Sequence, residues 1–217
     1  DEVNAAAEKL KAAGIIPFAH GGQAWQDATV FEAVAMGIGG NNYYKNCYVD
    51  LKESCLRSET TVKVFDQMRK LQSYTDEGSP GRDWNVATGM VIEGKAGFQI
   101  MGDWAKGEFT AAGKVPGVDY YCAPTPSNNG YLYNVDSFIF YKTSDPEKQE
   151  GQKLLAKLMM GKNFQKVFNL YKGSIPARLD VPMDEFDKCA KTSNSDIKTA
   201  GASGGLVPSF AHGMAQG

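Results

Sequence analysis

Short apolar segments alternate with longer segments of helical periodicity along this chain. Four of the short segments have the length and apolar character of buried strands: residues 15–19, 96–101, 118–122 and 135–141. Between strands, apolar residues recur every three or four positions, as from Val62 to Leu71, a segment preceded by the helix-capping type Ser58. This alternation predicts an α/β fold.

Turn-rich segments divide the pattern. Residues 76–82 contain Gly, Ser and Pro and separate two predicted helices, and the composition of residues 123–130 predicts a linker. Asp145 followed by Pro146 predicts the start of a later helix, because Asp caps helix amino termini and Pro suits the first helical position. The sequence contains no internal repeat.

Composition argues against two classes of function. The 217 residues carry 25 acidic and 23 basic side chains, for a net charge of −2, without a Lys/Arg block that would favour nucleic acid or an anionic membrane. No apolar run approaches the roughly 18 residues needed to cross a bilayer. With 42% apolar residues, the chain can bury one large or two small cores.

The cysteines lack the spacing of a metal or redox site, since no C-x-x-C pair occurs and the chain has only 2 histidines. Their even number fits two disulfides in an oxidising compartment, and the alternative is four buried thiols. Sequence alone does not determine the pairing. Our hypothesis joins Cys47 to Cys55 across a short loop and Cys122 to Cys189.

Common signatures of catalytic sites are missing from the sequence. It contains no G-x-S-x-G, Walker A, H-E-x-x-H or G-x-G-x-x-G motif. Asp103 and Glu108 are five positions apart on a predicted helix and share a face poorly, so two surface acids are a better interpretation than a glycosidase pair. We therefore expect neither an enzyme nor a bound cofactor or metal.

Two tryptophans have settings that suit a sugar ligand. Trp104 follows a predicted strand and a glycine, and Trp25 lies between the amides of Gln23 and Gln26. Sugars present a face of C–H groups that stacks on an indole ring, while their hydroxyls need hydrogen bonds. The alternative for any single tryptophan is core packing, which we assign to Trp84 in the first turn of an amphipathic helix.

Polar residues that could bond such a ligand occur at separate points of the chain. Asn134 and Asp136 precede a predicted strand at spacing i, i+2, which places both side chains on one side. Lys172 stands at a helix end, where the carbonyl groups already favour a cation. His212 is by residue type more often a core histidine than a ligand contact. Each residue is a weak signal by itself.

The segment GKAGFQIMGDWA, residues 94–105, resembles the strand and turn of family 1 extracellular solute-binding proteins, which serve carbohydrate ABC transporters. Three further segments are similar to the glucose-binding branch found in pseudomonads: NVDSF at 134–138, YKGSIPAR at 171–178 and FAHGMA at 210–215. The resemblance runs in collinear order over essentially the whole chain, and its more specific motif is GSIPAR.

This resemblance implies a periplasmic-binding-protein fold of class II, in which two lobes are joined by a hinge. Residues 1–120 and 179–217 would lie in the second lobe, and residues 121–132 would form a hinge crossover. Residues 133–178 would belong to the first lobe. The chain would then lack the N-terminal part that builds most of that first lobe.

The resemblance also implies a binding site in the interlobe cleft. Trp104 would stack on the sugar ring. Four polar residues would bond its hydroxyls: Asn134, Asp136, Lys172 and His212. The rim would hold Gln23, Trp25 and Gln26.

The implied function is to bind a monosaccharide, with glucose expected, and to deliver it to the membrane permease of an ABC transporter. The protein would be a periplasmic monomer whose signal peptide is not among these residues. The alternatives are a disaccharide or another hexose as ligand, or a glycoside hydrolase that uses Asp103 or Asp136. An amino acid or phosphate ligand would require a cationic cluster, for which Lys172 is the single candidate.

Overall fold

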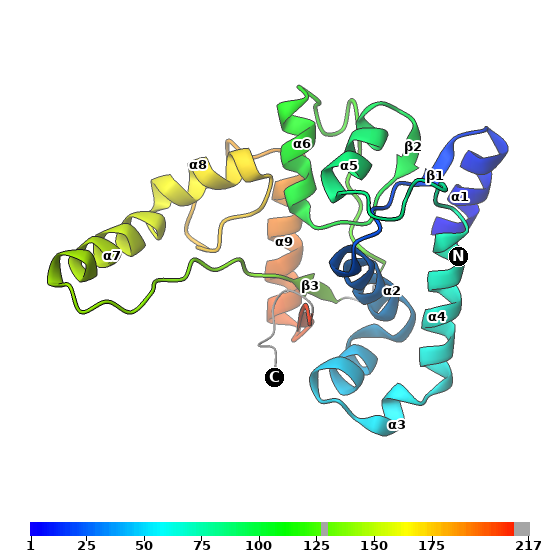
Figure 1. Cartoon of the computed structure of the whole chain (residues 1–217), viewed down its shortest axis with the longest axis horizontal. Helices are drawn as coiled ribbons and strands as arrows, with labels where there is room; N and C mark the ends of the chain where they lie inside the picture. Colours follow the sequence, from blue (N-terminus) through cyan, green and yellow to red (C-terminus); the bar gives the residue numbers. More distant parts are fainter. Residues whose placement is uncertain (127–129, 211–217) are drawn as a thin grey trace.

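The chain forms a body of helices and short strands, from which two helices project as an arm (Figure 1). The computed structural model describes residues 1–126 and 130–210. The arm is the segment 134–178, which leaves the body after a strand and returns to it through a loop (Figure 1). The remaining described residues form the body.

Helices and strands follow one another through the body. Its first part contains α1 (Glu2–Ala12), β1 (Ile16–Phe18), α2 (Ala24–Tyr44), a π-helical turn η1 (Lys45–Val49), α3 (Glu53–Leu56), α4 (Glu59–Gln72), α5 (Trp84–Ile92) and β2 (Ala96–Phe98). Next come a 3-10 turn η2 (Asp103–Ala105), α6 (Lys106–Ala111) and β3 (Tyr131–Tyr133). The arm contains α7 (Pro146–Met159) and α8 (Lys162–Lys172), and the body ends with α9 (Lys188–Ala202) and β4 (Leu206–Pro208).

Both predicted helix starts are confirmed by their caps. The Ser58 side chain accepts a hydrogen bond from the Thr61 amide at the start of α4, and Asp145 accepts from the Glu147 amide at 3.0 Å. Pro146 occupies the first position of α7. Within the described part of the chain, no helix combines the length and apolar character that a membrane span requires.

The strands pair in parallel across long stretches of sequence. Strand β1 pairs with β2, where Phe18 lies opposite Phe98, and β3 pairs with β4, where Tyr131 lies opposite Leu206. Parallel neighbours require a crossover connection, and helices supply it in both cases. The described residues therefore form the α/β architecture that the sequence predicts.

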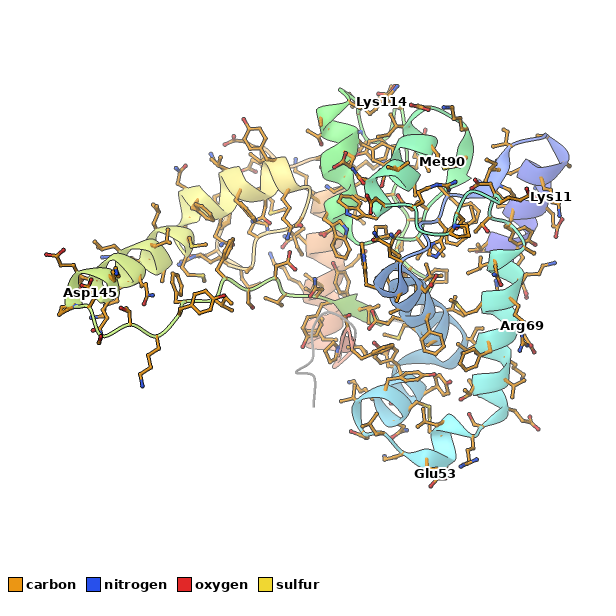
Figure 2. All side chains as sticks on the ribbon, in the orientation of Figure 1. Lys11, Glu53, Arg69, Met90, Lys114 and Asp145 are labelled. Carbon is orange, nitrogen blue, oxygen red and sulfur yellow. A yellow bond between two sulfur atoms is a disulfide. The ribbon has the colours of Figure 1, made fainter. Side chains whose placement is uncertain are left out.

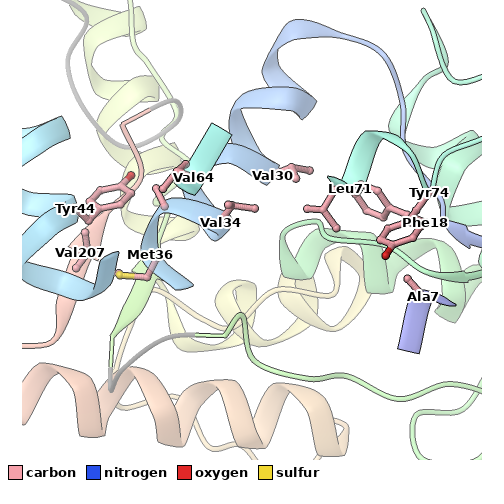
Figure 3. Close-up of a cluster of buried hydrophobic side chains, with 11 residues drawn as sticks. Ala7, Phe18, Val30, Val34, Met36, Tyr44, Val64, Leu71, Tyr74 and Val207 are labelled. Carbon is pink, nitrogen blue, oxygen red and sulfur yellow. The ribbon is translucent and has the colours of Figure 1, made fainter. Parts of the chain in front are cut away.

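The core of the body surrounds α2. Figure 3 shows Ala7, Phe18, Leu71 and Tyr74 gathered near one end of this helix, with Tyr44, Met36 and Val207 near the other. The buried members of this cluster are at most 7% exposed, and they come from α1, β1, α2, α4, the turn after α4, and β4. Apolar burial of this extent is the main source of stability of the body.

A buried carboxylate links α2 to the end of β4. The Glu32 side chain is 1% exposed and accepts hydrogen bonds from the Ser209 hydroxyl at 2.9 Å and from the Tyr44 hydroxyl at 3.1 Å. Burial, together with this carboxylate, raises the pKa of Tyr44 well above its usual range, so the phenol stays protonated and donates. These bonds hold the C-terminal strand against the core.

Two of the four predicted strands are wrong. Residues 118–122 contain a single bridge, between Pro116 and Tyr120, in place of a strand. Residues 135–141 have no helix or strand assignment, and Ile139 and Tyr141 are 74% and 80% exposed. A strand forms only where its backbone N–H and C=O groups find a neighbouring strand, and the described residues provide none beside this segment.

The other predicted boundaries need smaller corrections. The strands predicted at 15–19 and 96–101 exist but are shorter, as β1 and β2. Helix α2 extends from Ala24 to Tyr44 and is broken at Gly40, where φ is 72°. Glycine adopts this conformation without the steric cost that a Cβ would bring.

The arm exposes apolar side chains to solvent. Helix α7 buries no residue, and the two buried residues of α8, Gln165 and Asn169, are polar. Leu154 and Leu158 lie one turn apart in α7 and are 61% and 62% exposed. Figure 2 shows the arm, with Asp145 at its far end, extending away from the rest of the molecule. Its amphipathic helices therefore have an apolar face that the described residues do not cover.

Two disulfides connect the four cysteines, in the pairs that we hypothesised. Cys47 bonds to Cys55 between η1 and α3, and Cys122 bonds to Cys189 at the start of α9. The second bond joins a residue before β3 to the first turn of α9. The loop of chain that it closes contains the arm.

Charged residues gather where the arm meets the body. Lys106 is 7% exposed, and its Nζ lies 2.6 Å from Oδ2 of Asp187. The Asp103 carboxyl contacts the Ser174 hydroxyl and the Ile175 amide. Burial raises the pKa of Asp103 above its usual range, although nearby lysines and these hydrogen bonds favour the charged form.

We expect the Cys122–Cys189 disulfide to stabilise the protein more than Cys47–Cys55. The two bonds span 67 and 8 residues, and the loop-entropy model assigns about 2 kcal/mol more to the longer loop. Paired Cys→Ala variants of each bond, compared by urea unfolding, measure this difference. An equal or larger loss for the Cys47 and Cys55 variant would contradict the expectation.

We expect Asp103→Asn to raise stability at pH 7. A carboxyl whose pKa is higher in the folded than in the unfolded state destabilises the fold once it ionises, and this cost is absent at pH values below 3.8, its ordinary pKa. The gain should therefore shrink as the pH falls from 7 to 3, in thermal unfolding at each pH.

Asp187→Asn is the matched control for this variant. It keeps an oxygen that can cap Ala190 but leaves the buried Lys106 without its partner carboxylate. We expect it to lower stability at pH 7, because an unpaired buried charge is costly. If Asp103→Asn instead loses stability at pH 7, the folded protein favours the charged form of the Asp103 carboxyl, and the expectation is wrong.

Candidate functional site

The residues predicted to bind ligand follow the carboxyl ends of the parallel strands. Gln23, Trp25 and Gln26 come after β1, and Trp104 comes after β2. Asn134 is the first residue after β3. In α/β folds, ligands bind outside the carboxyl ends of parallel strands, because the connecting loops converge there. Gln23, Trp25, Gln26 and Trp104 therefore follow the carboxyl edge of the β1–β2 sheet, whereas Asn134 follows the carboxyl end of β3 in the second sheet.

The structure brings three of the predicted polar residues together. The Asn134 Nδ2 donates to Oδ1 of Asp136 at 3.0 Å, and the Lys172 Nζ donates to Oδ2 of the same carboxylate. Asn134 and Asp136 come from the segment after β3, whereas Lys172 is the last residue of α8. The Asp136 carboxylate thus joins two segments of the arm that are far apart in sequence.

Two details of this group suit a hydroxylated ligand. Oδ1 of Asn134 is buried and accepts no hydrogen bond from the described residues. A buried acceptor without a donor is costly, and a ligand hydroxyl is one group that could satisfy it. The Lys172 Nζ lies 5.8 Å from the centre of the Phe168 ring, so an aromatic face borders the polar group.

Trp104 lies in η2, with its indole ring folded back over Gly102. A Cβ atom at position 102 would fall 2.0 Å from the six-membered ring of the indole, so only glycine fits there. The carbonyl oxygen of Asp103, the neighbour of Trp104, lies close to Gly173, the neighbour of Lys172. The turn that carries Trp104 therefore adjoins the helix end that carries Lys172.

Gln23, Trp25 and Gln26 form a hydrogen-bonded group of their own at the start of α2. Oε1 of Gln23 accepts from Nε1 of Trp25 at 2.8 Å and from Nε2 of Gln26 at 3.0 Å. Gln26 is fully buried, and its amide also donates to the Arg82 carbonyl. Its Nε2 is thus engaged within the fold. The rim role of all three residues stays a prediction.

His212 lies outside the described residues. The nearest described anchor along the chain is the hydrogen bond that the Phe210 amide donates to the Tyr44 hydroxyl, at 3.2 Å. Its role as a ligand contact also stays a prediction.

Sequence reasoning missed the residues that join these parts. The sequence indicated Asp103 only as a possible acid of a hydrolase. In the structure, its carboxyl contacts the turn that follows Lys172. Gly107 had no sequence signal beyond its residue type, and Gly173 was noted only as part of the GSIPAR motif. Their importance depends on which backbone atoms lie beside them, and no local pattern encodes that contact.

The chemistry available here is recognition by hydrogen bonds and an aromatic face. A carboxylate accepts from two adjacent hydroxyls, an ammonium donates to others, and such charge-assisted bonds are about twice as strong as neutral ones. Asp136, one of the acids considered for a hydrolase, is paired with Lys172. Among residues 1–126 and 130–210, no group of three or more His, Cys, Asp or Glu could hold a metal ion.

Similar proteins of known sequence share almost the full length of this chain. Probable sugar-binding periplasmic proteins of Brucella suis biovar 1 (strain 1330) and Rhizobium meliloti (strain 1021) are 48% and 47% identical over 216 residues, which is 99% of this chain. The same alignments cover 51% and 52% of those relatives. The chain thus spans about half the length of the curated relatives it matches.

A solved structure and a family profile agree with these relatives. A chitin oligosaccharide binding protein, 18% identical, has the same fold, with a TM-score of 0.71 over 94% of this chain and 52% of that protein. The fold is therefore the α/β fold of the periplasmic-binding-protein type. The profile described as bacterial extracellular solute-binding protein matches residues 1–159. This chain belongs to the bacterial extracellular solute-binding protein family.

Proposed function

We propose that the polypeptide containing this chain binds a sugar in the periplasm and delivers it to the permease of an ABC transporter, without catalysing a reaction. The observation that carries this proposal is the Asn134–Asp136–Lys172 group beside the turn of Trp104. The relatives named sugar-binding periplasmic proteins support it. The two disulfides agree with an oxidising compartment.

The proposed ligand is a neutral monosaccharide, with glucose preferred. The Lys172 charge is offset by Asp136, so this group has no excess positive charge to attract a phosphate or carboxylate. Paired donors and acceptors suit adjacent ring hydroxyls, and the indole of Trp104 suits the C–H face of a pyranose. Trp104 and these polar groups would contact opposite parts of one sugar.

We further propose that the arm belongs to a first lobe that chain outside these 217 residues completes. The exposed apolar face of α7 and α8 supports this, together with the greater length of the relatives. In this arrangement, residues 1–120 and 179–217 form the second lobe, 121–132 the hinge crossover and 133–178 part of the first. Sugar would favour the closed state of the lobes, because it contacts both.

Calorimetric titration of the complete polypeptide with a panel of monosaccharides and disaccharides tests the proposed ligand. We expect heat of binding with glucose and weaker or no binding of disaccharides. Preferential binding of another hexose would overturn the glucose assignment, and absence of heat with every sugar would overturn the proposed function.

Trp104→Ala should lose most of the affinity in the same titration, at a cost of about 2–4 kcal/mol, as for aromatic anchors at buried contacts. Trp84→Ala is the control, because it removes an indole from α5. We expect it to retain affinity at temperatures where it stays folded. Unchanged affinity in Trp104→Ala would identify Trp104 as a packing residue.

Leu158→Ala tests the proposed completion of the first lobe. In the 217-residue chain, Leu158 is 62% exposed, so its truncation should change the free energy of unfolding by less than about 0.5 kcal/mol. In the complete polypeptide, the same change should cost about 2–5 kcal/mol, because the side chain would be buried.

Leu71→Ala serves as the matched control for this comparison. Leu71 is 2% exposed in the body core, so its truncation should be costly in both forms of the protein. Equal, small effects of Leu158→Ala on the free energy of unfolding in both forms would contradict the proposal that residues outside these 217 cover this face.

A further inference from the structure

Two glycines meet where the arm joins the body. A Cβ atom on Gly107 would lie 2.9 Å from the carbonyl oxygen of Lys172 and 3.1 Å from that of Tyr171. A Cβ atom on Gly173 would lie 2.7 Å from the backbone nitrogen of Gly107 and 3.0 Å from the carbonyl oxygen of Asp103. The first turn of α6 and the end of α8 therefore touch through their backbones, and any side chain here would push them apart.

This contact lies between the two halves of the candidate site. On the body side, Gly107 follows η2, which carries Trp104. On the arm side, Gly173 directly follows Lys172, whose ammonium group pairs with Asp136. The separation of the two backbones thus sets how far Trp104 stands from the Lys172–Asp136 pair.

We call the backbone contact between Gly107 and Gly173 the glycine joint. Further contacts hold both sides of this joint in place. Lys106 precedes Gly107 and is fixed by its ion pair with Asp187, at 2.6 Å. Asp103 contacts the side chain of Ser174, directly after Gly173. Gly173 also ends α8 in the left-handed conformation, with φ of 90°, which a residue with a side chain adopts only at a cost. The joint is therefore held on both sides and has no spare room.

We propose that Gly107 and Gly173 are positioning residues for ligand binding, because their backbone contact sets the distance between Trp104 on the body and the Lys172–Asp136 pair on the arm. This proposal rests on the proposed sugar-binding function. Hydrogen bonds to a sugar have a narrow range of useful distances, so a shift of about 1 Å at the joint reduces affinity strongly.

The test compares glycine variants that differ only in what surrounds them. Gly107→Ala inserts a methyl group into the joint, whereas Gly89→Ala adds one to α5, where nothing lies within 4 Å. Likewise, Gly173→Ala and Gly113→Ala both place alanine at positive φ, of 90° and 70°, but position 113 has open space. Each control repeats the backbone effect of its partner without the contact.

Two measurements on the complete polypeptide test the effect of each glycine substitution on ligand binding and on the position of the arm. Calorimetry gives sugar affinity, and pulsed electron paramagnetic resonance gives the distance from arm to body. The spin labels enter as unnatural amino acids at Lys153 in α7 and Lys63 in α4, both exposed. We expect Gly107→Ala to shift or broaden this distance and to lower affinity about tenfold or more, with a larger effect of Gly173→Ala. Gly89→Ala and Gly113→Ala should match the wild type in both.

The outcomes separate this proposal from the function on which it rests. An unchanged distance in Gly107→Ala overturns the proposal, and so does a shifted distance with wild-type affinity. Equal losses of affinity in Gly107→Ala and Gly89→Ala also overturn it, since a general effect on helix stability would explain both. If the wild type binds no sugar, the proposed function fails, and the distance measurement still decides whether the glycines position the arm.

Discussion

Parallel pairing between strands that are distant in sequence is the constraint on which this structure depends. Because β1 pairs with β2 in the same direction, the loops before Trp25 and Trp104 leave the sheet at the same edge. Strand β3 pairs in the same way with β4, so Asn134 and Ser209 follow their strands at the same edge of the second sheet. Each parallel pair needs a long crossover, and α2 is the part of the first crossover that supplies most of the buried core. Both pairings thus place strand ends that are distant in sequence beside one another.

The body and the arm differ in how much of their apolar surface is buried. In the body, α2 buries apolar side chains on several sides, and Glu32 accepts hydrogen bonds from the hydroxyls of Tyr44 and Ser209. In the arm, Leu154 and Leu158 remain exposed, and the segment 135–141 has no strand partner among the described residues. What fixes the arm is its base, where the Cys122–Cys189 disulfide, the Lys106–Asp187 pair and the glycine joint lie together. A rigid base and an uncovered apolar face suit a segment that serves as part of a larger lobe.

Sequence patterns predicted what depends on local chemistry. The caps at Ser58 and Asp145 are visible in sequence because capping is a contact of a side chain with its own helix. The strands at 118–122 and 135–141 were predicted wrongly, because a short apolar segment indicates that a strand would be stable beside a partner and cannot show that the partner exists. For the site, the pattern indicated Asn134, Asp136 and Lys172 individually. Their mutual bonds became visible only when the arm brought α8 back beside the segment after β3.

The sequence by itself determined the α/β class, the helix boundaries set by caps, and a set of residues suited to a sugar, since composition and short-range periodicity carry that information. Tertiary structure alone decided which strands found partners, that Lys172 pairs with Asp136, and that Gly107 meets Gly173. The physical reason is common to all three. Each is a contact between segments separated by long loops, and its distance depends on the packing of everything between them.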